Sequence, residues 1–170
     1  MEMLKMNGNN EIGKYEIKPD AITSFKGREF AFLSNMNMSY FDDGLEYNGY
    51  TFNSVETAFH AQKDPSKAGM FSEIIRPDFA RKKGKSLKSV RKDWDEVKEG
   101  IMYDLVKKKF FENPKYREKL LATGDRQLVE GNTWNDRFWG VCDGVGLNKL
   151  GEILMKVRKE LREEGLDNGA

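Results

Sequence analysis

The sequence predicts an α+β fold: a predominantly α-helical single domain with a small antiparallel β element near its N-terminus. Helical patterns dominate the chain after residue 54, and one strong hairpin signal precedes them. A length of 170 residues also suits one domain with its own core. We expect a flexible lead-in over residues 1–20, the folded domain over 21–165 and a tail over 166–170.

The β element is predicted by residues 45–52. Asn48-Gly49 suits a type I′ turn, and aromatic and β-favouring residues flank it on both sides. Upstream, the run 25–35 mixes aromatic and basic residues, and we interpret it as a strand that enters a loop.

Caps and breakers define the helices. Ser54 is expected to cap the first helix, which Asp64-Pro65 ends, and Asp93 is expected to cap the longest one. The further helices are predicted over 66–75, from Pro77 to near Gly84, over 94–112, from Pro114 to Thr123-Gly124 and over 148–163. Residues 128–130 are interpreted as a short strand, and 131–147 as loop-rich.

Composition limits the function. The 29 basic and 28 acidic side chains nearly cancel, so any affinity for nucleic acid must come from a local patch. A single cysteine, Cys142, excludes an internal disulfide and fits a reducing compartment. The chain has no apolar run near 18 residues, so we expect a cytoplasmic protein with no membrane contact. One histidine and one cysteine leave little for a metal site, so we expect neither metal nor cofactor.

Glu56 and Lys63 are seven residues apart, which places them on one side of the predicted helix, among apolar neighbours. A carboxylate among apolar neighbours is unexpected unless it has a partner or a function, because removing an unpaired charge from water costs free energy. One interpretation is an ion pair or a cap near the helix start; the other is catalysis. His60 is expected to be a packed or partly exposed ring.

Three further segments each have two interpretations. The aromatic loop 134–140 fits either a plug in the core or a platform that stacks on a nucleobase. Gly144 and Gly146 fit either a simple turn or a phosphate-binding helix start. From Arg81 to Lys92 there are seven basic residues and no acid, which fits either a solvated surface or a phosphate-recognition patch.

Short motifs occur in order from about Phe25 to Leu161. They include Phe32-Leu33-Ser34-Asn35, Ser54-Val55-Glu56 with Ala61-Gln62-Lys63, the Asp93–Lys98 run, Lys109-Phe110, Thr123-Gly124-Asp125, Asn135-Asp136 with Trp139-Gly140, and Asn148 with Leu150-Gly151. In order and spacing this set resembles the NADAR (YbiA-like) family. Two positions depart from the pattern: Thr57 stands where some members have His, and His60 where they have Gln.

The resemblance implies a catalytic domain that acts as an N-glycosidase on a base–ribose bond. Known activities of the family are removal of ADP-ribose from guanine, by members that are antitoxins to DarT-type toxins, and hydrolysis of ribosylaminopyrimidine phosphates in riboflavin biosynthesis. We expect the first activity, on DNA or RNA, with a toxin encoded nearby as partner. A riboflavin-pathway enzyme that takes a ribosylated nucleobase metabolite, and a non-catalytic reader of ADP-ribose, are the alternatives.

Candidate site residues follow from the chemistry and the resemblance together. Glu56 is expected to be the acid/base, and Asp136 to activate water or stabilise the cation. Lys63 is expected to bind phosphate or ribose, or to attack an opened sugar as a Schiff base. The expected substrate-binding residues are Arg28, Phe32, Ser34, Asn35, Trp94, Lys109, Trp139, Gly140 and Asn148. We expect these residues to form one concave site.

Overall fold

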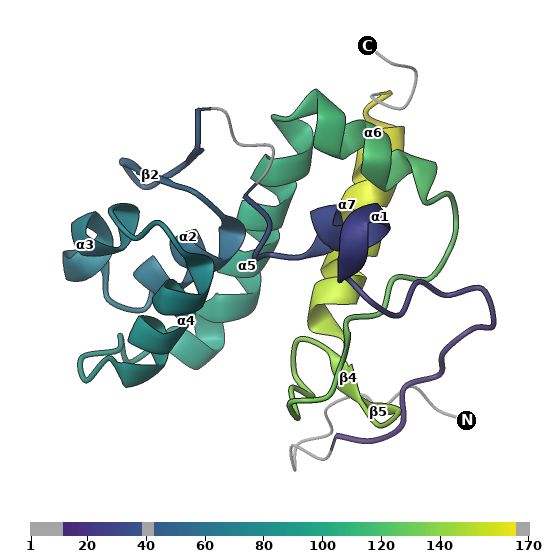
Figure 1. The fold of residues 1–170 in the computed structure, drawn as a ribbon, viewed down its shortest axis with the longest axis horizontal. Coiled ribbons are helices and arrows are strands. Elements are labelled where there is room, and N and C mark those ends of the chain that lie inside the picture. The colour runs from purple at the N-terminus through teal and green to yellow at the C-terminus, as the bar shows by residue number, and fades with distance from the viewer. Residues whose placement is uncertain (1–11, 39–42, 166–170) are drawn as a thin grey trace. The chain divides into compact units, whose positions relative to one another are not determined.

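A computed structural model describes residues 12–38 and 43–165 (Figure 1). Helices dominate and two small sheets complete the fold, so the α+β class is confirmed. The predicted tail over 166–170 and the first eleven residues of the predicted lead-in lie outside the described residues. The elements are α1 (Gly27–Phe30), η1 (Ala31–Leu33), β1 (Leu45–Tyr47), β2 (Tyr50–Phe52), α2 (Val55–Ala61), η2 (Pro65–Lys67), α3 (Ala68–Ser72), α4 (Pro77–Ser86), α5 (Trp94–Phe111), α6 (Pro114–Ala122), β3 (Gly131–Asn132), β4 (Val141–Cys142), β5 (Val145–Gly146) and α7 (Lys149–Glu163).

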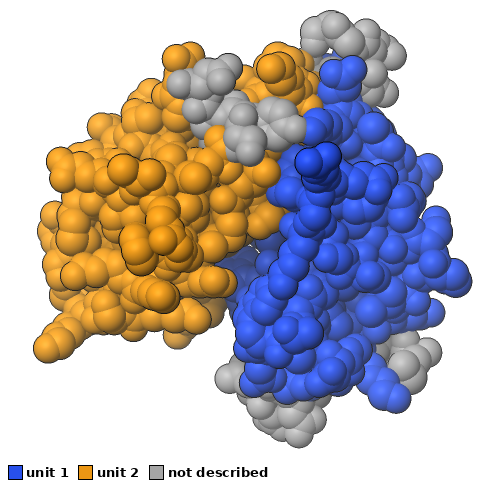
Figure 2. All heavy atoms as spheres, in the orientation of Figure 1, with its two compact units in different colours: residues 1–33, 118–170 blue, residues 34–117 orange. Residues whose placement is uncertain are grey.

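The chain divides into two compact units, coloured separately in Figure 2. Unit 1 consists of residues 1–33 and 118–170, and it holds the three-stranded sheet and α7. Unit 2 consists of residues 34–117, and it holds the β1–β2 hairpin and the helices from α2 to α5.

The centre of unit 2 is α2, which contacts the hairpin, α3, α4 and α5. Asn48 and Gly49 both have positive φ, as a type I′ turn requires, so the predicted hairpin is confirmed. Ser54 caps α2 as predicted, because its hydroxyl accepts a hydrogen bond from the Thr57 amide at 3.1 Å.

The long helix α5 begins at Trp94 with Asp93 at the N-cap position, as predicted, but the Asp93 side chain does not make the capping hydrogen bond. Asp93 makes no side-chain cap, because both of its carboxylate oxygens accept hydrogen bonds from the Arg91 guanidinium, at 2.6 and 2.9 Å. A bidentate pair with arginine thus replaces the capping bond.

The main element of unit 1 is α7, which confirms the helix predicted over 148–163, and its side chains Leu150, Leu154, Val157 and Leu161 are buried. Strand β4 pairs parallel to β3 and antiparallel to β5. The turn between β4 and β5 contains Gly144, which favours the turn interpretation of this glycine.

Two strand predictions are wrong. Residues 27–33 form α1 and η1, and the consecutive burial of Phe32 and Leu33 is incompatible with the alternation of a strand. In 128–130, Leu128 makes one isolated bridge with Ile22. The Val129 amide donates to the Ile22 carbonyl at 2.8 Å and the Gly131 amide to that of Thr23 at 3.2 Å, so the pairing stays a single bridge.

Candidate active site

Glu56 on α2 lies beside His60, one helical turn away. Oε1 of Glu56 lies 2.9 Å from Nε2 of His60, and the two side chains are 13% and 7% exposed. The backbone amide of Glu56 donates to the carbonyl of Asn35 at 3.0 Å, which anchors the start of the helix. A nearly buried carboxylate therefore has a histidine as its hydrogen-bonding partner.

The orientation of His60 follows from close packing of α2 against α4. At Gly84 a Cβ would lie 2.1 Å from Nδ1 of His60, so only glycine leaves room for the ring. Within the described residues, Nδ1 is buried without a hydrogen-bond partner. A proton on Nδ1 would be buried without an acceptor, so the geometry favours the tautomer with its proton on Nε2, donated to Glu56.

Lys63 lies just beyond α2, and its ammonium is 5.7 Å from the centre of the Trp94 ring. The same indole packs on Phe59 with ring centres 4.9 Å apart. Burial lowers the pKa of Lys63, and the nearby Glu56 carboxylate partly opposes this shift. These residues place a cation and a flat aromatic surface in the neighbourhood of Glu56.

Lys109 on α5 is 1% exposed, and its ammonium donates to the carbonyl oxygen of Ser34 at 3.0 Å. The Phe110 and Tyr116 rings lie 5.2 and 4.7 Å from the same nitrogen. Burial lowers the pKa of Lys109 to about 7. The Lys109 side chain therefore points into the protein, where its ammonium binds the protein's own backbone.

Ser34 and Asn35 link these groups. Nδ2 of Asn35 donates to Sδ of Met102 at 3.4 Å, and its carbonyl accepts from the Glu56 amide. The segment is thereby held on one side by α5, through Lys109, and on the other by α2. Six of the predicted residues therefore belong to unit 2: Ser34, Asn35, Glu56, Lys63, Trp94 and Lys109.

The other six predicted residues belong to unit 1: Arg28, Phe32, Asp136, Trp139, Gly140 and Asn148. Arg28 is exposed on α1, and Phe32 is buried with the Lys119 ammonium 5.8 Å from its ring centre. The Trp139 indole packs edge-on against Phe138 at 4.8 Å.

Asp136 holds the aromatic loop. Its Oδ1 accepts hydrogen bonds from the amides of Phe138 and Trp139, at 3.2 and 3.0 Å. The Asn132 side chain in turn bonds both backbone groups of Asp136, at 2.7 and 3.0 Å. One carboxylate oxygen of Asp136 therefore stabilises the turn in which Asp136 lies.

Asn148 is fully buried and has a left-handed φ of 51°. Its side chain accepts from the Glu130 amide and donates to the Leu128 carbonyl, both at 2.9 Å. The next two amides, of Lys149 and Leu150, donate to carbonyls of the aromatic loop. They are thus not open to an anion, which argues against the phosphate interpretation of this helix start.

Residue-by-residue reasoning missed two side chains. His60 is a packed ring, as expected, but its contact with Glu56 was not predicted, although a spacing of four is typical of side-chain pairs on a helix. Nothing in the sequence predicts a role for Asn132, because its side chain reaches the carbonyls of Asp136 and Val141 only when the loop has folded. In the part of the chain that the structure describes, no three His, Cys, Asp or Glu side chains gather at metal-binding distance. Nor is any described helix long and apolar enough to cross a bilayer.

Comparison with known proteins identifies the class. The NADAR domain model matches residues 24–162. N-glycosidase Npun_R5314 of Nostoc punctiforme is 39% identical over 126 residues, 70% of this chain and 80% of the relative. N-glycosidase YbiA of Escherichia coli is 36% identical over 71% of this chain and 77% of its own length. The NMR structure of YbiA matches with a TM-score of 0.75 at 30% identity, covering 89% of this chain and 91% of that one.

The chain belongs to the NADAR domain family. It is an enzyme of the N-glycosidase class, like the relatives that match most of its length. A 74-residue stretch, 43% of this chain, is 46% identical to the riboflavin biosynthesis protein VVA0006 of Vibrio vulnificus, but covers only 20% of that protein.

Proposed function

We propose that Glu56 is the acid/base of this N-glycosidase. The observation that carries the proposal is the nearly buried carboxylate, hydrogen-bonded to His60 through one oxygen. Cleavage of an N-glycoside passes through a cation-like sugar, and a carboxylate stabilises that charge. The bond between the sugar carbon and the base nitrogen breaks, its electron pair leaves with the base, and water supplies the new hydroxyl.

In this mechanism Oε1 of Glu56 stays on the His60 proton while the second oxygen takes a proton from the attacking water. His60 fixes the carboxylate rotamer and does not touch the sugar. We propose that Lys63 binds phosphate or ribose oxygens electrostatically, and that Trp94 forms a wall of the site, because the Lys63 ammonium already lies beside that indole. Asp136 as water activator stays a prediction, which Asp136→Asn tests.

For the substrate, we propose ADP-ribosylated guanine in DNA or RNA, so that the protein would remove the modification and counter a toxin encoded nearby. The support is the basic segment from Arg81 to Lys92, which lacks acids in a protein of nearly zero net charge. Such a segment suits a substrate with several phosphates. The lone, buried Cys142 suits work in the reducing cytoplasm.

A second candidate is a ribosylaminopyrimidine phosphate of riboflavin biosynthesis. It is favoured by the local identity to the Vibrio vulnificus protein, whose name refers to that pathway. This substrate is small, so it would need Glu56 and Lys63 but not the basic segment.

One assay separates the two candidates. The protein is incubated separately with ADP-ribosylated guanine DNA and with the ribosylaminopyrimidine phosphate, and the released sugar and base are identified. Glu56→Gln should fold normally and lower turnover at least about a hundredfold on the true substrate. Wild-type turnover in the folded variant would remove Glu56 from the mechanism, and release from neither compound would refute both substrates.

A further inference from the structure

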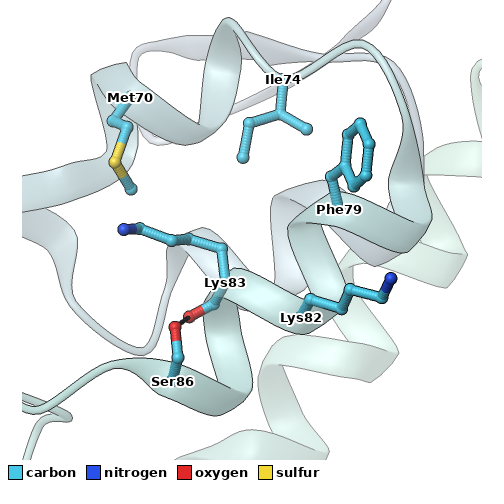
Figure 3. A pocket seen from close by; sticks show the side chains of 6 residues that line it. All are labelled: Met70, Ile74, Phe79, Lys82, Lys83 and Ser86. Atoms are coloured by element: carbon cyan, nitrogen blue, oxygen red, sulfur yellow. Dashed lines mark hydrogen bonds between the residues drawn. The ribbon is translucent and has the colours of Figure 1, made fainter.

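One face of unit 2, formed by α3, the segment after it and α4, contains a hollow of about 560 Å³. We call it the α3–α4 groove. Its lining combines three apolar side chains with two lysines and a serine: Met70, Ile74, Phe79, Lys82, Lys83 and Ser86. In Figure 3 the Lys83 amine extends toward Met70, whereas Lys82 extends beneath Phe79.

Helix α4 separates this groove from the candidate active site within unit 2. Pro77, Ala80 and Gly84 are buried, and Gly84 meets His60 on α2. Phe79 and Lys83, four residues apart, form the opposite side and line the groove. The same helix therefore supports Glu56 through His60 on one side and presents the groove on the other.

The apolar part of the groove is unusually exposed. Phe79 is 51% exposed, Met70 38%, and the neighbouring Ile75 78%. The Arg76 guanidinium lies 4.5 Å and the Lys82 ammonium 6.0 Å from the centre of the Phe79 ring. A group of exposed apolar side chains on one face is typical of an interaction site, and an aromatic ring beside cations is the arrangement on which nucleobases stack in single-strand binding proteins.

Basic side chains outnumber acidic ones around the groove, where Glu73 and Asp78 are the acids of the lining segments. Among the described residues, Lys82, Lys83 and Lys85 form no ion pair with a carboxylate. The nearest acid along the chain, Asp78, is neutralised by Arg76 at 2.6 Å. Lys85 is also near enough to Lys63 to lower the pKa of Lys63 further, behind the larger effect of burial, so the positive charge extends toward the candidate active site.

We propose that the α3–α4 groove binds a single strand of nucleic acid, with a base against Phe79 and phosphates on Lys82 and Lys83. The inference rests on the proposed nucleic-acid substrate and assigns the surface that holds the strand next to the modified base. A flat ring beside unpaired ammonium groups matches the alternation of base and phosphate along a strand. An acidic apolar peptide would use the same lysines but would not require an aromatic ring.

The test measures binding separately from hydrolysis. A fluorescently labelled, unmodified twelve-nucleotide DNA strand is titrated with the full-length protein, and anisotropy is followed over a range of salt concentrations. Phe79→Leu, which keeps apolar volume but loses the flat ring, should weaken binding about tenfold, and Phe79→Trp should restore it. Lys82→Ala with Lys83→Ala should reduce the magnitude of the salt slope by about 1.4, because each lost phosphate contact on a single strand contributes about 0.7.

The matched control removes two exposed lysines elsewhere, Lys18→Ala with Lys115→Ala, and should leave the slope unchanged. Wild-type affinity in Phe79→Leu, or equal slopes in the two double variants, overturns the proposal. If Phe79→Leu binds the strand normally, and an acidic apolar peptide binds both Phe79 variants but not the variant that lacks Lys82 and Lys83, the groove is a peptide site instead. Hydrolysis of a small ribosylated base tests the proposed catalysis independently, because groove variants should leave it unchanged.

Discussion

Replacing Lys109 with methionine should change how the stability of the fold depends on pH. The Lys109 side chain is 1% exposed, and burial lowers its pKa from 10.5 to about 7. Between these two values the unfolded chain binds a proton that the folded chain does not, so the free energy of unfolding rises with pH. Below about pH 7 both states carry the proton, and the cost of burying the ammonium is present in full.

The magnitude follows from the same two pKa values. Between pH 7 and pH 9, Lys109 should contribute an increase of about 2 kcal/mol to the free energy of unfolding. Methionine has similar length and no titrating group, so Lys109→Met removes this increase. At pH 7 the variant loses the hydrogen bond to the Ser34 carbonyl but no longer buries a charge.

The assay is urea unfolding of both proteins at pH 7 and pH 9, followed by circular dichroism. Other groups titrate in this range, but they are common to both proteins and cancel in the difference. The control is Lys108→Met on the same helix, whose ammonium pairs with Glu112 at 3.0 Å and whose side chain is 34% exposed. The reasoning is refuted if wild type and Lys109→Met gain equal stability between the two pH values.

Three further predictions concern the candidate active site. Gly84→Ala should lower kcat at least about tenfold with little change in KM, because the new methyl group displaces the His60 ring. An unchanged kcat would show that the position of His60 does not affect catalysis. Borohydride added during turnover should trap no adduct on Lys63, because its proposed role is electrostatic, and a labelled Lys63 peptide in mass spectrometry would instead show a Schiff base. Dialysis against EDTA should leave the rate unchanged, and a loss that a divalent ion restores would contradict the expectation of a metal-free site.

Local signals account for the parts of the fold that the sequence predicts well. Asn48-Gly49 is sufficient for a type I′ turn because both positions need positive φ. Ser54 defines the start of α2 through a bond to its own helix, and the periodicity of α7 follows from one buried stripe. Each of these features depends on residues within a few positions of one another.

The features that sequence reasoning misses depend on contacts between distant positions. The contacts of residues 128–130 are with distant partners: Leu128 makes an isolated bridge with Ile22, and the Glu130 amide donates to Asn148, eighteen residues later. The position of the Lys109 ammonium depends on the Ser34 carbonyl, 75 residues earlier, which accepts a hydrogen bond from it. Composition and periodicity cannot predict these partners, because the residues come into contact only when the chain has folded.

The two interpretations of Glu56 can now be compared on physical grounds. A capping role is excluded, because Ser54 already bonds the Thr57 amide and the Glu56 carboxylate bonds a side chain instead. The remaining structural explanation, a helical ion pair, would normally lie on the surface, where burial carries no cost. Here the pair is nearly buried, and the close packing of Gly84 holds the ring in place. Asp136 likewise has one oxygen engaged, in its case with backbone amides of its own loop. Among the described residues, the contact found for the Glu56 carboxylate is that of Oε1 with His60, and its second oxygen suits the acid/base role proposed above.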